Sequence, residues 1–161
     1  MKMIALLLSL GMCAYAQLEL SDPAQKSGEM FGEISIPAID LIQPVRSGVD
    51  ASIIDIGVAH WPGSAKPGEP GNMVLAGHRT TKTAPFLKIE KLKVGDVIMV
   101  TNKDQAIAKY QVYEMFVVDP VKGWFVTRSS NESVEAILTI FTCHPLYSNL
   151  QRFVVRARLV K

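Results

Sequence analysis

The sequence predicts an all-β domain with a few short helices, arranged as a sandwich or a barrel. Short apolar runs recur along the chain and are separated by Gly, Pro and Asn, which commonly end strands. The last run alternates apolar residues with arginines, as a strand with one buried face does. Segments with a helical pattern are few, and each is only about one or two turns long.

The expected strands follow the chain from Phe31 onward. They cover residues 31–36, 41–45, 72–76, 96–101, 106–118, 136–143 and 153–160. The short helical patterns cover residues 49–56, 85–92 and 131–135. The second pattern begins with Pro85, which the first turn of a helix tolerates. Residues 63–71 form a loop rich in Gly and Pro, without a signal for regular structure.

Composition limits the size and the partners of the protein. The chain has 161 residues, of which 48% are apolar and 20% charged, which indicates one ordered domain and excludes a disordered chain. Its 17 basic and 15 acidic residues give a net charge of +2. A charge this small predicts no nucleic-acid partner.

Residues 1–16 have the pattern of an export signal. Lys2 precedes an apolar run of about 14 residues that ends in Ala14-Tyr15-Ala16, an A-x-A cleavage sequence, whereas a spanning helix needs roughly 20 residues. A cleaved signal peptide is therefore favoured, with a short membrane anchor as the alternative. We expect residues 17–30 to be a linker and 31–161 to be the folded domain. Such a protein would be extracytoplasmic, at the cell surface or associated with the membrane.

Cys143 is the strongest candidate for chemistry. The chain has two cysteines, and Cys13 lies in the export segment, which leaves Cys143 as an unpaired thiol. Cys143 ends an apolar run and is followed by a proline, so the thiol is expected at a strand end beside a loop. A thiolate nucleophile needs an imidazole or a cation nearby. His78 follows another apolar run and could supply it through the fold.

The remaining polar candidates are less specific. His144 neighbours Cys143 on an extended chain and points to the other face, so we expect it to line a groove or the surface. His60 is expected to anchor a loop. An arginine could stabilise an oxyanion, and spacing alone does not choose among the candidates. These are Arg79, Arg128, Arg152, Arg156 and Arg158. Paired metal-binding spacings are absent from the sequence, so no metal and no cofactor is predicted.

Three segments together resemble the sortases, which are cysteine transpeptidases of bacterial surfaces. The segments are FGEISIP at 31–37, PGNMVLAGHRTT at 70–81, and TIFTCHP at 139–145 followed by QRFVV at 151–155. The resemblance spans about residues 31–160. The GHRTT and TCHP sequences are most similar to class E and next to class D, although Lys82-Thr83 replaces the Tyr-Gly that is common in class E.

The resemblance implies an eight-stranded sortase β-barrel and a role for each matching residue. Cys143 matches the nucleophile and His78 the general acid and base. Arg152 matches the arginine that stabilises the oxyanion, which decides among the arginines that spacing left open. Three further residues are expected to contact the substrate: Thr142, His144 and Arg79.

The implied reaction is cleavage of an LPXTG- or LAXTG-like sorting signal between Thr and Gly. The acyl group would pass to an amine, such as that of a peptidoglycan-precursor peptide. The partners would be surface proteins with a C-terminal sorting signal, which become attached to the cell wall. Two alternatives remain: a cysteine hydrolase or protease that uses water at the same site, and a non-catalytic barrel that binds peptides.

Overall fold

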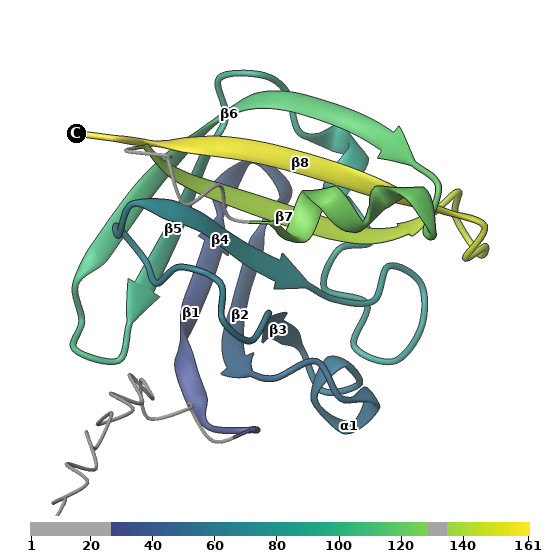
Figure 1. Cartoon of the computed structure of the whole chain (residues 1–161), viewed down its shortest axis with the longest axis horizontal. Coiled ribbons are helices and arrows are strands. Elements are labelled where there is room, and N and C mark those ends of the chain that lie inside the picture. The colour runs from purple at the N-terminus through teal and green to yellow at the C-terminus, as the bar shows by residue number, and fades with distance from the viewer. Residues whose placement is uncertain (1–26, 129–134) are drawn as a thin grey trace, which may run out of the picture.

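The strands of the domain form one closed sheet. In the computed structural model, which describes residues 27–128 and 135–161, eight strands close into a barrel in the order β1-β2-β3-β4-β7-β8-β6-β5 (Figure 1). The strands are β1 (Met30–Ile36), β2 (Leu41–Ser47), β3 (Val58–His60), β4 (Gly71–Ala76), β5 (Val97–Asn102), β6 (Ile107–Val118), β7 (Ala136–His144) and β8 (Gln151–Val160). The prediction of a mainly β domain with an eight-stranded barrel is confirmed.

Within the described ranges, helical structure is limited to short segments. They are η1 (Pro37–Ile39), α1 (Ala51–Ile54), η2 (Ile89–Lys91) and η3 (Lys122–Thr127). The helix expected over 49–56 is therefore reduced to α1, and only η2 forms within 85–92. The pattern at 131–135 falls almost wholly on residues outside the described ranges, as does the export segment 1–16. None of the helices in the described ranges has the length and the apolar character needed to cross a membrane.

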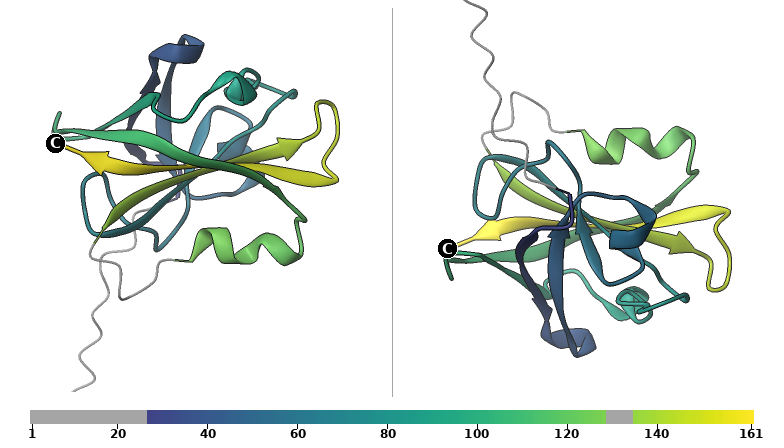
Figure 2. Two further views of the ribbon diagram at one scale, coloured as in Figure 1. Left: turned by 90° about the horizontal axis from the view of Figure 1, so that it is seen from above. Right: turned by 90° about the horizontal axis from the view of Figure 1, so that it is seen from below.

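Two of the strand pairs are parallel, and one of them fixes the position of the candidate site. β4 and β7 run in parallel, with Leu75 opposite Ile140 and Ala76 opposite Phe141. Their carboxyl ends therefore lie at the same edge of the sheet. β8 returns antiparallel to β7. Figure 2 shows the turn that joins β7 to β8 on the side of the molecule away from the C-terminus.

The barrel is filled by alternate residues of its strands. The core includes Ile34, Val45, Leu75, Val100, Tyr110, Leu138, Ile140 and Val155. Burial of each such aliphatic or aromatic side chain contributes roughly 1.5–3 kcal/mol. Because successive side chains of a strand point to opposite faces, inward Leu138 and Ile140 leave Phe141 and Cys143 on the outer face of β7.

Candidate active site

Three of the predicted site residues converge on the outer face of the barrel, at the edge where β4 and β7 end. Cys143 on β7 lies directly opposite Arg152 on β8 in the antiparallel register. On the other side of β7, the last parallel pair is Ala76 with Phe141. His78 follows β4 by two residues, and Thr142, the residue before Cys143, bonds to Gly77, the residue before His78. The fold thus brings together chain segments whose residues 78, 143 and 152 are 65 and 9 positions apart in the sequence.

The thiol of Cys143 is free and half-buried. Its neighbour Thr142 points the other way and is only 2% exposed. The Thr142 hydroxyl donates a hydrogen bond of 2.7 Å to the carbonyl of Gly77, the residue before His78. Thr142 therefore ties the end of β7 to the end of β4 from within, and its side chain does not lie on the face that carries Cys143.

His78 is held by a carboxylate that the sequence analysis did not select. The Nε2 atom of His78 lies 2.8 Å from Oδ1 of Asp55, the residue that ends α1. The Nζ atom of Lys82 lies 3.3 Å from the other oxygen, Oδ2. The hydrogen bond from His78 is the main influence that holds the pKa of Asp55 below its ordinary value of 3.8, and Lys82 adds to it. One sequence signal could have pointed to Asp55, because an acidic residue at the carboxyl end of a helix is unfavourable.

Arg79 forms an internal ion-pair network behind the site. Its side chain is 1% exposed and pairs with Glu90, the middle residue of η2. The Nδ1 atom of His144 lies 2.9 Å from Oε1 of Glu90 and 3.0 Å from Nη1 of Arg79. A hydrogen bond from Arg79 lowers the pKa of Glu90, so Glu90 is ionised and can only accept. Nδ1 of His144 donates to Glu90 in the tautomer that carries a hydrogen there, and accepts from Arg79 in the other tautomer.

Arg79 and His144 were both predicted to contact the substrate, and the structure gives them different exposure. Arg79 has no exposed donor to offer a peptide, and its Nη1 lies 3.5 Å from the backbone carbonyl of Cys143. Its position favours a role in holding the end of β7 over direct contact with substrate. His144 remains 22% exposed and has its Nε2 atom free of the Glu90 contact. It lies beside Phe153, with 5.9 Å between ring centroids.

Arg152 is anchored by one carbonyl of the turn between β7 and β8 and by one at the start of β8. Its Nη1 atom donates to the carbonyls of Asn149 and Gln151, each at 2.9 Å. The other arginines of β8 are occupied differently, because Arg158 stacks on Tyr113 at 4.5 Å and Arg156 lies over an aromatic ring of β6. Of the three, Arg152 faces Cys143, which agrees with the choice that the resemblance made.

The six-residue 3-10 helix η3 covers the outer face of β4 and β7 next to the site (Figure 1). The side-chain amide of Asn72 on β4 donates to the carbonyl of Val126 in η3 at 2.9 Å. Thr139 on β7 donates to the amide oxygen of Asn72 at 2.7 Å. Buried polar groups that satisfy one another in this way fix an element in place. η3 therefore forms a wall on one side of the outer face.

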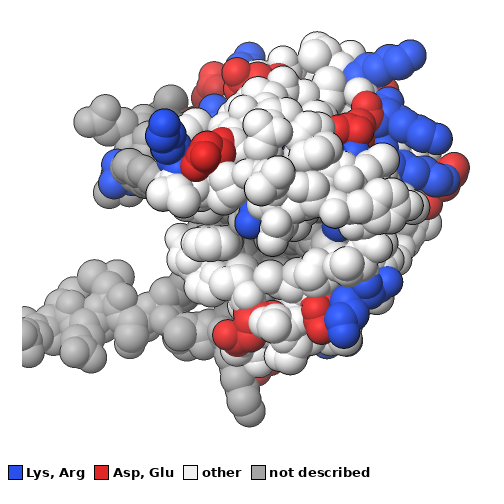
Figure 3. All heavy atoms as spheres, turned by 90° about the vertical axis from the view of Figure 1, so that its right-hand side faces the viewer, with Lys and Arg blue, Asp and Glu red and all other residues white. Residues whose placement is uncertain are grey.

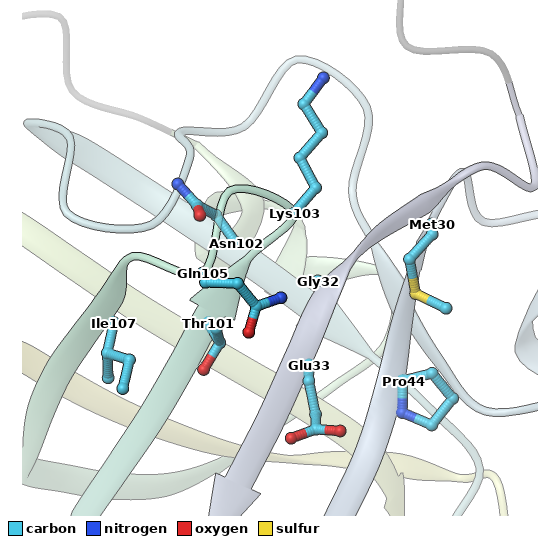
Figure 4. A pocket seen from close by; sticks show the side chains of 9 residues that line it. All are labelled: Met30, Gly32, Glu33, Pro44, Thr101, Asn102, Lys103, Gln105 and Ile107. Carbon is cyan, nitrogen blue, oxygen red and sulfur yellow. The ribbon is translucent and has the colours of Figure 1, made fainter.

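The surface on this side of the molecule is mostly uncharged. Figure 3 shows it hollowed near the middle, with Lys, Arg, Asp and Glu gathered toward the rim. A different hollow of about 400 Å³ lies between β1, β2 and the turn from β5 to β6, lined among others by Glu33, Thr101 and Gln105 (Figure 4). Its lining includes none of the predicted site residues. Within the described ranges, no group of three or more His, Cys, Asp or Glu side chains is arranged to hold a metal ion.

Comparison with known proteins identifies the relatives of this chain. The family described as Sortase domain matches residues 34–160. Sortase SrtE1 of Streptomyces coelicolor is 32% identical over 154 residues, which cover 83% of this chain and 41% of that protein. Sortase D of Bacillus subtilis is 32% identical over 120 residues, or 74% of this chain and 57% of that protein. The chain thus spans about half the length of these curated relatives.

Solved structures of sortases share the fold. The Clostridium perfringens Sortase D5 transpeptidase superposes with a TM-score of 0.76 at 31% identity, covering 84% of this chain and 82% of that one. Clostridium perfringens sortase C with the C-terminal cell wall sorting motif gives a TM-score of 0.75 at 29% identity, over 85% and 74%. The predicted resemblance to sortases, with relatives in classes E and D, is confirmed. From the matched domain, the barrel and these relatives together, we conclude that the chain belongs to the sortase family.

Proposed function

We propose that this chain is a cysteine transpeptidase in which Cys143 is the nucleophile, His78 the general acid and base, and Arg152 the group that stabilises the oxyanion. The observation that supports the proposal is the strand register, which sets Arg152 of β8 opposite Cys143 of β7 and pairs β7 on its other side with β4, two residues before His78. A thiol between an imidazole and a guanidinium has the partners that stabilise a thiolate.

The proposed reaction has two half-reactions. The Cys143 thiolate attacks the carbonyl carbon of the Thr in a sorting signal, and Arg152 stabilises the negative oxygen that forms. The bond from Thr to Gly breaks, a thioester forms, and His78 gives its proton to the leaving amine. An acceptor amine then attacks the thioester, passes a proton to His78 and releases the thiolate. Atoms and charge balance without an oxidant or a cofactor.

The proposed substrate is a surface protein that carries an LPXTG- or LAXTG-like signal at its C-terminus. Support comes from the likeness to a sortase C structure solved with a C-terminal cell wall sorting motif. The proposed acceptor is the amine of a peptidoglycan-precursor peptide. We further propose that residues 31–161 act outside the cytoplasm near the membrane, after export directed by residues 1–16 and across the linker 17–30.

The test uses purified protein with fluorogenic LPXTG and LAXTG peptides, with and without an added amine. Wild-type protein is expected to cleave between Thr and Gly and to form the amide product when the amine is present. Cys143→Ala is expected to abolish cleavage, and His78→Ala and Arg152→Ala to lower kcat/KM by roughly 10²-fold or more. Cys13→Ala is the matched control and should retain activity.

The products separate this proposal from its alternatives. A hydrolase would release only the free acid, whatever the concentration of amine. A non-catalytic barrel would bind the peptide without turnover. Activity that persists in Cys143→Ala would refute the assignment of the nucleophile.

A further inference from the structure

We propose that Asp55 is a positioning residue for His78: it fixes the hydrogen on Nε2 and leaves Nδ1 as the atom that exchanges the proton in catalysis. The inference rests on the proposed function, because it concerns the base of that reaction. Asp55 is not one of the three residues that are proposed to act on the substrate.

The first step follows from hydrogen-bond chemistry. Nε2 of His78 and Oδ1 of Asp55 are 2.8 Å apart, a distance typical of a charge-assisted hydrogen bond. An ionised carboxylate can only accept, so the hydrogen between the two atoms must belong to Nε2. Nε2 therefore carries a hydrogen whether the imidazole is neutral or charged. Only Nδ1 is left to gain and lose a proton.

The second step concerns how Asp55 is held. Asp55 ends α1, where its backbone amide donates to the carbonyls of Ala51 and Ile53. The side chain of Ile53 is 5% exposed, so α1 is fixed against the barrel. Lys82 contacts the second oxygen of Asp55 from the loop that carries His78. A carboxylate anchored on one element and contacted twice from another holds that loop in a defined position.

The test is Asp55→Asn, which keeps the size of the side chain and removes its charge. We expect kcat/KM at the pH optimum, normalised to the concentration of active sites, to fall about tenfold. This is smaller than the rate enhancement of roughly 10² to 10⁴ that general acid–base catalysis supplies as a whole. The chain has three histidines, so nitrogen NMR can follow each ring. Neutral His78 should be the Nε2–H form in the wild type and a mixture in Asp55→Asn.

Other variants give the test its direction. Asp55→Glu keeps the carboxylate and should recover part of the rate. Lys82→Met removes the cation beside Asp55 and keeps the carboxylate, so neutral His78 should stay in the Nε2–H form. Asp50→Asn is the matched control, because Asp50 begins α1 and its carboxylate contacts Ser27. It should leave the rate and the tautomer of His78 unchanged.

The outcomes distinguish this inference from the proposed function. If the wild type is active and Asp55→Asn keeps both its rate and the Nε2–H tautomer of His78, the inference alone is overturned. A wild type that cleaves no sorting peptide would overturn the proposed function. The NMR measurement would still decide whether Asp55 fixes the tautomer of His78.

Discussion

At the scale of single residues, the three histidines of the chain differ because their neighbours differ. His78 and His144 each have a carboxylate oxygen within hydrogen-bonding distance, at 2.8 and 2.9 Å. His60 has none. Its ring stacks on Phe31 with 3.8 Å between centroids, and its Nε2 atom contacts Ser64 and Ala65 in the following loop. The prediction that His60 anchors a loop is confirmed, and its chemistry is that of a structural residue.

The burial of His60 predicts a pH dependence of stability. Burial is the largest influence on its pKa and lowers it from 6.5, so between that folded value and 6.5 the unfolded chain binds a proton that the folded chain does not. The contribution of His60 to the free energy of unfolding is therefore full above pH 6.5 and falls as the pH drops below it. The slope is at most about 1.4 kcal/mol per pH unit.

Urea denaturation at pH values from 5 to 7.5 measures this effect by difference between two proteins. His60→Gln can still bond to the loop but does not titrate, so we expect it to be less stable than wild type at pH 7.5, with a flatter pH dependence. Parallel curves for the two proteins would show that His60 does not cause the acid sensitivity.

At the scale of elements, patterns along the chain predicted most strands and missed features that depend on tertiary contacts. β3 was not predicted, because three residues are too few to show alternation. The segment 85–92 was expected to be a helix, yet its buried residues are Phe86, Ile89 and Leu92. These recur every third residue, which is the period of a 3-10 turn and not that of an α-helix.

The candidate site divides in the same way. Cys143 and His78 could be selected from the sequence, because each lies at the end of a strand-like run beside a loop. Spacing could not choose Arg152, because the cross-strand register that sets it opposite Cys143 exists only in the folded barrel. The contact between Asp55 and His78 was not predicted either, because the two residues are 23 positions apart in the chain. A local sequence pattern does not show which distant residues come into contact.

The ion pair between Arg79 and Glu90 joins η2 to the ends of β4 and β7. Its loss is predicted to lower stability more than the loss of an ion pair at the surface. Glu90→Gln leaves the buried guanidinium of Arg79 without its counter-charge. We expect it to lower the free energy of unfolding by roughly 2–3 kcal/mol, below the usual loss for a buried pair because Glu90 is 39% exposed. Glu114→Gln is the matched control.

Glu114 faces Arg156 across β6 and β8 at 3.5 Å, on the surface. Loss of such a pair is expected to cost less than about 1 kcal/mol. Both variants can be compared with wild type by urea denaturation at pH 7. Equal losses would indicate that burial of Arg79 does not set the strength of the pair with Glu90.

At the scale of the whole molecule, closure of the barrel depends on a close approach between β1 and β5. Gly32 on β1 is paired with Asn102 on β5. A Cβ atom at position 32 would lie 2.1 Å from the backbone carbonyl oxygen of Thr101, which cannot move aside without parting the two strands. Gly32 also lines the hollow between these strands (Figure 4). The backbone of Gly32 does not have a positive φ, so glycine is required here because no space is left for a side chain.

Gly32→Ala is accordingly expected to open the barrel along the seam between β1 and β5. We expect a loss of roughly 3 kcal/mol or more in the free energy of unfolding, which takes a large share of the stability of a domain of this size. The unpaired edges should also promote self-association, visible by size-exclusion chromatography.

Gly57→Ala is the control, because its Cβ would come no closer than 3.4 Å to Pro44. We expect this variant to change the free energy of unfolding by less than about 1 kcal/mol. A monomeric Gly32→Ala protein as stable as Gly57→Ala would mean that the seam yields without opening. In that case β1 could shift along β5 while the edge that carries Cys143, built from β4, β7 and β8, stays in place.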